Sequence, residues 1–315
     1  MSAKPNQPLP AGHRLPGYRL LSTLARGGFS FVYLAEDDDK AQVAIKEYLP
    51  AALSVRTGNA LKPSVSDTDA ATFRYGLRCF FAEGRVLASV SHPNVVRVLN
   101  FFRANDTAYM VMRYESGVTL KQRLLQGNTP LPESWLRRTF AQLLNGLREV
   151  HARKLLHLDI KPANIYLRED GTPVLIDFGA SRQMLCEENP SLRPMFSPGL
   201  AAPEVLADRA KLGPWSDIYS IGATLYACMF LELPPPAAER LAGDRYVPAS
   251  KAGAGKYSAK LLEIADWCLR LDHMQRPQSV LALQKALLGQ GHETTRIPDD
   301  PKAVFRWIMG LDSRP

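Results

Sequence analysis

Cysteine is scarce in this sequence, and its four copies, Cys79, Cys186, Cys228 and Cys268, lie far apart. No two of them form a C-x-x-C pair, which argues against a zinc site and against a framework of disulfides. We therefore expect reduced thiols with structural roles.

Long hydrophobic runs are also missing. The longest apolar stretch, Ile221 to Leu231, is far shorter than the roughly 20 residues that a membrane-spanning helix needs. The N-terminus lacks the charged-then-apolar pattern of a secretion signal. We therefore expect no transmembrane segment and a cytoplasmic location.

Basic residues outnumber acidic ones but do not cluster. The formal net charge is +8 and the isoelectric point is near 9.3, which favours anionic partners in general. However, no run of basic residues reaches five, and no basic stripe alternates with aromatic residues as it does in single-strand binders. We expect no nucleic-acid partner.

Internal repeats and low-complexity blocks are absent as well, which excludes solenoids and propellers. With 46% hydrophobic and 22% charged residues among 315, the composition is that of a globular protein. Because single cores stop growing beyond about 250–300 residues, two lobes around a cleft would fit this length.

The first lobe is predicted from strand-like patterns between turn residues. A single helix is predicted over 76–90, ended by Ser91-His92-Pro93. The strand-like runs cover 18–21, 31–35, 42–46, 95–102 and 108–114. These patterns indicate a small lobe with an antiparallel sheet.

The second lobe is predicted to be mostly helical, with long helices over 132–153 and 215–231. The expected fold class is therefore α+β, with a small β-rich lobe containing one main helix over about 16–114 and a larger α-helical lobe over about 118–288. The two together form one domain over 16–288.

Both ends of the chain look different from the domain. Residues 1–15 are rich in proline and small polar residues, so we expect a flexible lead-in. Residues 289–315 read as a polar linker followed by a short apolar helix over 301–311. That helix has two open alternatives: it docks on the large lobe, or it binds a partner protein or the membrane interface.

Two features of the first lobe carry little information when taken alone. A glycine-containing turn, Ala25 to Val32, joins two strand-like runs and would let backbone approach a phosphate. Such turns are also ordinary hairpin features. Lys46 lies in an apolar strand, where a lysine is usually just part of a solvated face.

The second lobe contains a denser set of polar residues. Asp159, Lys161 and Asn164 fall within eight residues, and Asp177-Phe178-Gly179 follows a buried-looking strand thirteen residues after Asn164. Phosphoryl transfer needs oxygen ligands for Mg²⁺, a group that orients the hydroxyl and a cation on the phosphates. Turn-capping roles would explain any one of these residues, but hardly the whole set at these spacings.

On these motifs the chain resembles the eukaryotic-type (Hanks-type) serine/threonine protein kinases, from roughly Tyr18 to Leu288. The resemblance implies a two-lobed kinase fold with four catalytic positions. Lys46 would hold the α- and β-phosphates, with Glu83 as its helix partner; Asp159 would be the base, and Lys161 would lie beside the γ-phosphate.

The resemblance also implies ATP and Mg²⁺ (or Mn²⁺) as cofactors, with Asn164 and Asp177 as the metal ligands. Met112 falls at the gatekeeper place, before a hinge over 113–115. The implied nucleotide-binding residues are Ala25, Arg26, Gly27, Gly28, Val32, Ala44, Lys46, Met112, Arg113 and Tyr114.

Further matches extend to the end of the domain. Glu204 and Arg276 stand where the family has a structural salt bridge, and Asp217 begins a matching helix. Residues 45–50 are similar to a bacterial group of these kinases, in which the stretch between Lys46 and Glu83 is an insertion expected to wrap the small lobe.

The chain departs from the family pattern at three positions. Ala25 and Ser30 replace the first and third glycines of the phosphate loop, while Gly27 keeps the middle place. Leu158 replaces the arginine that usually precedes the catalytic aspartate, so the usual clamp for a phosphate in the following segment is missing.

The resemblance therefore implies a non-specific serine/threonine protein kinase that phosphorylates proteins, itself included. Lys161, two residues after Asp159, marks the serine/threonine class. A pseudokinase acting as a nucleotide-binding scaffold is the alternative. A small-molecule kinase would not be expected to carry the run Ser197 to Leu200, which forms the peptide-docking platform in protein kinases.

Overall fold

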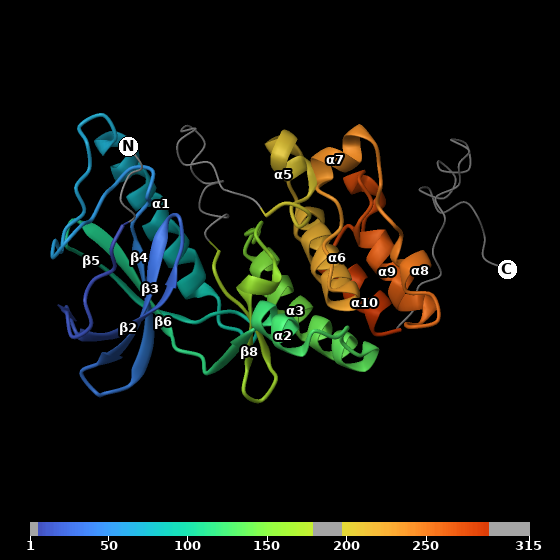
Figure 1. Cartoon of the computed structure of the whole chain (residues 1–315), viewed down its shortest axis with the longest axis horizontal. Coiled ribbons are helices and arrows are strands. Elements are labelled where there is room, and N and C mark those ends of the chain that lie inside the picture. The colour runs from blue at the N-terminus through green and yellow to red at the C-terminus, as the bar shows by residue number, and fades with distance from the viewer. Residues whose placement is uncertain (1–5, 179–196, 290–315) are drawn as a thin grey trace.

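The computed structural model describes residues 6–178 and 197–289. Two lobes follow one another along the long axis of the molecule, one built from strands with helix α1 and the other mainly from helices (Figure 1). The expected α+β, two-lobed architecture is confirmed. Gly179 and the helix expected over 301–311 lie outside the described residues.

The small lobe contains a six-stranded sheet in which every neighbouring pair is antiparallel. The strands are arranged in the order β1-β2-β3-β4-β6-β5. They are β1 (Arg14–Leu15), β2 (Tyr18–Arg26), β3 (Ser30–Asp37), β4 (Gln42–Tyr48), β5 (Val98–Ala104) and β6 (Thr107–Arg113).

Side chains alternate across this sheet, so each face has its own apolar core. Along β4, Val43 and Ile45 join one cluster, whereas Tyr48 joins the cluster that continues into the large lobe. Helix α1 (Ala70–Ser89) packs on the second face through Phe73, Phe80 and other buried residues. It begins six residues before the predicted start and ends one residue before the predicted end.

The chain before β2 does not behave as the composition predicts. Residues 6–15 cover the first face of the sheet, where Leu9 and Leu15 are buried in its apolar cluster. The backbone N–H of Leu9 donates to the Tyr33 hydroxyl at 3.0 Å. The expectation of a flexible lead-in is thus wrong for residues 6–15, because the sheet supplies the apolar surface that this short segment lacks.

The large lobe is built around helix α6 (Pro214–Phe230), which is buried along nearly its whole length. A proline in its first turn suits the helix start, since the missing N–H would have no helical partner there. Around it lie α2 (Leu120–Gly127), α3 (Glu133–Ala152), α5 (Pro203–Ala207), α7 (Ala237–Ala242), α8 (Ala249–Ala252), α9 (Ala259–Cys268) and α10 (Val280–Leu287). The ends of α3 and α6 lie within one residue of the predicted ends.

A small three-stranded sheet joins the lobes, in the order β7 (Gly117–Thr119), β8 (Ile165–Arg168) and β9 (Pro173–Leu175). Residues 92–96 connect it to the small lobe, since Val96 N–H donates to Leu175 O and Leu175 N–H donates to Asn94 O, both at 2.9 Å. The loops at the ends of β8 and β9 carry most of the chemistry.

Among the described helices, none is both long and apolar enough to cross a bilayer. Cys228 and Cys268 are free and buried, as expected. Cys79 on α1 is disulfide-bonded, which corrects the expectation that all four thiols are reduced. Cys186 lies outside the described residues.

Candidate active site

Three of the predicted site residues meet between the two lobes. Lys46 on β4 places its Nζ 2.7 Å from Oδ1 of Asp177 and 3.8 Å from Oε1 of Glu83 on α1. The lysine and the glutamate are buried, whereas the Asp177 side chain is 47% exposed. One cation thus bridges two carboxylates, and one of these carboxylates still faces solvent.

A second group forms in the loop before β8. Lys161 Nζ lies 2.7 Å from Oδ2 of Asp159, and the Asn164 amide nitrogen donates to the same oxygen at 2.9 Å. The amide also donates to the Asp159 carbonyl at 2.9 Å. Because its nitrogen is used in this way, Asn164 presents its amide oxygen as the atom suited to a metal ion.

The carboxyl of Asp159 is tuned by opposing effects. Burial raises its pKa, and the charge of Asp177 acts in the same direction. The hydrogen bond and charge of Lys161 lower the pKa, but the net direction is upward. A carboxylate with a raised pKa is a better proton acceptor than an ordinary one, which suits a general base.

His157 joins the two groups. Its buried ring packs on Phe178 with ring centroids 4.3 Å apart. Its Nδ1 accepts from the Asp159 N–H at 3.3 Å, so Nε2 must carry the proton that bonds the Ile176 carbonyl at 3.2 Å. The neutral Nε2–H ring therefore ties the backbone of Asp159 to the segment that carries Asp177.

Asp217 holds the loop before Asp159 from inside α6. Its buried carboxylate accepts the N–H groups of His157 and Leu158 at 2.8 and 2.7 Å and lies 2.7 Å from His151 Nε2. Burial alone would raise the pKa of Asp217, but these partners hold it below the ordinary value. Leu158 has φ of 62°, a left-handed conformation that bulky residues rarely adopt, so this anchoring stabilises a strained backbone.

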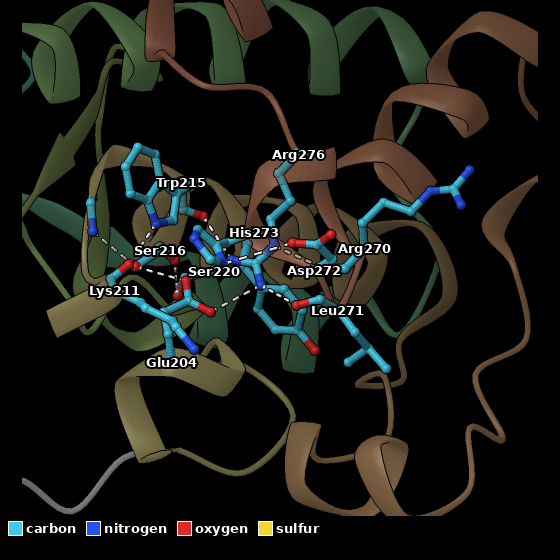
Figure 2. A network of polar contacts seen from close by, with 12 residues as sticks. Glu204, Lys211, Trp215, Ser216, Ser220, Arg270, Leu271, Asp272, His273 and Arg276 are labelled. Atoms are coloured by element: carbon cyan, nitrogen blue, oxygen red, sulfur yellow. Dashed lines mark hydrogen bonds and ion pairs between the residues drawn. The ribbon is translucent and has the colours of Figure 1, made fainter. Parts of the chain in front are cut away.

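A buried ion pair fixes the large lobe below the site. Arg276 Nη1 and Nη2 bind Glu204 Oε1 and Oε2 at 2.7 and 3.0 Å, as the resemblance implied. Figure 2 shows the guanidinium between this carboxylate and the 270–272 turn, where it also donates to the carbonyls of Arg270 and Leu271. Ser216 at the start of α6 donates to Glu204 as well, so α5 is held to α6.

The predicted nucleotide-binding residues lie along the strands of the small lobe. The pairing sets Ala25 opposite Val32, Val32 opposite Lys46, and Ala44 opposite Met112. The glycine turn is closed by a hydrogen bond from Gly27 N–H to Ser30 O at 2.8 Å. Arg26, Gly28, Arg113 and Tyr114 lie at the β2–β3 turn or at the end of β6.

Two arrangements near the site were not predicted from the sequence. Glu115, just after β6, accepts a two-point hydrogen bond from Arg168 on β8 at 2.6 and 2.7 Å, which anchors the connection between the lobes. The N–H groups of Leu49 and Ala51 donate to the carbonyls of Phe29 and Gly28 at 2.9 and 2.8 Å. The segment after β4 thus holds the glycine turn in place.

No local pattern marks either arrangement, because Glu115 and Arg168 are 53 positions apart in the sequence. Backbone donors such as Leu49 N–H have no signature in the sequence either. Within residues 6–178 and 197–289, no three His, Cys, Asp or Glu side chains cluster as a metal site.

The family comparison matches residues 18–288 to the protein kinase domain. A serine/threonine-protein kinase C from Synechocystis is 30% identical over 283 residues, which cover 86% of this chain and 49% of the relative. Kinase pkn2 from Myxococcus xanthus is 28% identical over 86% of this chain and 32% of its own length. The chain thus spans half or less of these two proteins.

A solved structure, described as the apo form of PpkA-294, has a similar fold. Its TM-score to this chain is 0.78 at 33% sequence identity, and the match covers 89% of this chain and 99% of the other. The similarity therefore extends over most of the chain.

Proposed function

The chain belongs to the protein kinase family, and from that premise we propose that it transfers the γ-phosphate of ATP to serine and threonine hydroxyls of proteins, itself included. The observation that carries the proposal is the meeting of two groups of side chains. Lys46, held by Asp177 and Glu83, lies next to the loop in which Lys161 and Asn164 hold Asp159.

These residues match what the reaction needs. The ammonium of Lys46 would bind the α- and β-phosphates, and Lys161 would neutralise charge on the γ-phosphate as it moves. Asp159 would accept or orient the proton of the attacking hydroxyl, helped by the burial that raises its pKa. Lys161 already contacts this carboxylate, so the same ammonium would position both the Asp159 base and the γ-phosphate.

Asn164 and Asp177 would hold Mg²⁺ or Mn²⁺, which neutralises the phosphate oxygens when bound. The fit rests on donor chemistry: a half-exposed carboxylate and an amide oxygen are the hard ligands that these ions prefer. Asp177 has φ of 61°, and its ion pair with Lys46 holds its carboxylate beside the lysine ammonium. The reaction consumes ATP, so the same proposal puts the enzyme in the cytoplasm.

The serine/threonine class is supported by the position of Lys161 and by the named bacterial relatives. The rival reading, a nucleotide-binding scaffold without catalysis, would usually have lost one of the five residues at the centre of the site. All five are present, namely Lys46, Glu83, Asp159, Asn164 and Asp177. Lys46 contacts Glu83 and Asp177, and Asn164 donates a hydrogen bond to Asp159.

Labelled ATP provides the direct test. The purified chain is incubated with γ-labelled ATP and Mg²⁺ or Mn²⁺, and label is mapped on the chain and on a generic basic protein. We expect label on serine and threonine in both. Tight nucleotide binding without any transfer, under either metal, would favour the scaffold instead.

A further inference from the structure

A pocket of about 620 Å³ opens beside Lys161. Its walls come from α2, from residues 161–163, from the turn 197–200 and from the end of α6 with the residues that follow it. Since Lys161 Nζ contacts Asp159 at 2.7 Å, the pocket begins one side chain away from the proposed base. A substrate peptide whose hydroxyl reached Asp159 would run past this opening.

The pocket walls are largely apolar and open to solvent. Leu125 of α2 is 71% exposed, while Leu231 and Leu233, which follow α6, are 37% and 48% exposed. Leu200 also belongs to the lining and is buried. Exposed apolar side chains that converge from two elements on one hollow are typical of a binding surface and not of scattered surface residues.

The backbone fixes the shape of this pocket. Gly199 has φ of +80°, and a Cβ at this position would lie 2.5 Å from the Pro234 carbonyl. The turn 197–200 is closed by Leu200 N–H donating to Ser197 O at 3.1 Å. The two walls therefore approach as closely as a glycine permits, and a ligand would enter a preformed site with little ordering cost.

Positive charge is concentrated on the α2 side of the pocket. The lining includes Lys121 of α2 and one acid, Glu232, while Lys161 is already paired with Asp159. Helix α2 carries Lys121 and Arg123 and has no acidic residue. Ala163 and Ala227 also line the pocket and carry no charge. An arginine beside α2 would meet like charge, whereas a carboxylate there would meet opposite charge.

We propose that this pocket receives a residue flanking the phosphorylated hydroxyl, and that the favoured substrates are protein segments with a leucine-sized apolar side chain there and an acidic residue nearby. The inference deepens the proposed kinase function and rests on it. The protein then selects substrate sites with apolar and acidic flanking residues, in contrast to a kinase that selects arginine or lysine.

A positional peptide series tests the substrate class. Each peptide carries one serine in an alanine background, and each flanking position is changed in turn to leucine, aspartate or arginine. We expect kcat/KM to rise about tenfold for leucine at one position, which corresponds to about 1.4 kcal/mol. We also expect a gain for aspartate and a loss for arginine at positions near it.

Variants of the full chain connect these preferences to the pocket. Leu125→Ala and Leu233→Ala should each reduce the ratio of kcat/KM between the leucine and alanine peptides. Leu241→Ala is the matched control, since Leu241 on α7 is 61% exposed and lies outside the pocket lining. Lys121→Glu should reverse the order of the aspartate and arginine peptides.

Three results overturn the inference. The first is a preference for arginine-flanked peptides in the wild-type chain, and the second is an unchanged leucine ratio in both leucine variants. The third is a peptide rate that rises for every sequence when the chain is ended at Gly291, because the pocket would then hold residues 301–311 of the chain itself. If no peptide and no generic protein is phosphorylated, the proposed function fails as well.

Discussion

Arg56 forms a two-point ion pair with Glu47 in the interior of the small lobe, with Nη1–Oε1 and Nη2–Oε2 distances of 2.6 and 2.7 Å. Both residues are almost fully buried. The hydroxyls of Tyr33 and Tyr109 donate to the same carboxylate at 2.7 and 2.8 Å. Burial and the charge of Glu47 raise the pKa of both phenols, so they remain donors.

This pair connects the segment after β4 to the sheet. Arg56 also donates to Gln7 O, so the N-terminal segment is held by the same side chain. Glu47 is the neighbour of Lys46 but points to the opposite face of β4, because side chains alternate along a strand. Part of the insertion between Lys46 and Glu83 packs on the small lobe, and it contacts the glycine turn through Leu49 and Ala51.

The first prediction is that Glu47→Gln or Arg56→Met lowers the free energy of unfolding by about 3–5 kcal/mol, because each leaves a buried charge without its partner. Urea unfolding measures this change. The control is Lys62→Met, which removes an exposed ion pair with Asp106 and should cost less than about 1 kcal/mol. The double variant Glu47→Leu/Arg56→Met should recover part of the loss; equal costs for Lys62→Met and Arg56→Met would contradict this account.

The second prediction concerns the cation and the carboxylate between the lobes. Lys46→Met and Asp177→Asn should each lower kcat/KM at least about a hundredfold, since each removes a charge that acts on the phosphates or the metal. Asparagine tolerates the left-handed backbone at Asp177, so this variant should keep the wild-type melting temperature. Wild-type turnover in either variant, with unchanged melting, would show that the assigned role is wrong.

The third prediction is a pH dependence set by Asp159. Burial raises its pKa above the ordinary value near 3.8, so kcat should fall with decreasing pH earlier than it would for an exposed aspartate. Lys161 opposes that rise, and Lys161→Ala should therefore move the acid limb of the profile to higher pH. Lys161→Arg should restore it in part. If the acid limb does not move in Lys161→Ala, Lys161 does not set the pKa of the base, and the prediction is wrong.

Part of the site follows from local sequence, and part does not. Asp159, Asn164 and Asp177 lie in compact motifs next to predictable strands, so spacing alone brings them near one another. Lys46 and Glu83 come from a strand and a helix, and only the family pattern pairs them. All these assignments of catalytic role stay predictions.

The contacts that were missed are long-range. Nothing near Arg56 indicates that a fully buried guanidinium will find Glu47, and proline-rich residues 6–15 contain too few apolar side chains to predict that they order. Alternation along β4 could have placed Glu47 on the face opposite Lys46. Its partners come from β3, β6 and the segment after β4, which only the folded sheet brings together.

The fourth prediction is that Asp217→Asn destabilises the fold by about 1–3 kcal/mol near neutral pH, because buried N–H groups of His157 and Leu158 lose a charged acceptor. The pKa of Asp217 is held below its ordinary value near 3.8. Its stabilisation is therefore present above that pH and is lost as the pH falls through the lower folded-state value. Unfolding of both proteins across this range should show the difference shrinking in acid.

The last prediction is that activity does not require a phosphate in the segment between Asp177 and Glu204. Kinases that need one usually pair it with an arginine beside the catalytic aspartate, through charge-assisted hydrogen bonds. Leu158 takes that place here; its side chain is apolar and buried, and Asp217 holds its backbone. No cation can therefore act from this position.

The available hydroxyls in that segment include Ser181 and Ser191, which lie outside the described residues. Replacing both with alanine and treating the enzyme with phosphatase should change turnover on an outside substrate less than about tenfold, or roughly 1.4 kcal/mol of barrier. A larger loss would mean that a phosphate orders the segment through another basic residue, such as Arg182 or Arg193. Phosphatase-treated wild-type enzyme is the matched control, because it separates removal of phosphate from removal of the hydroxyls themselves.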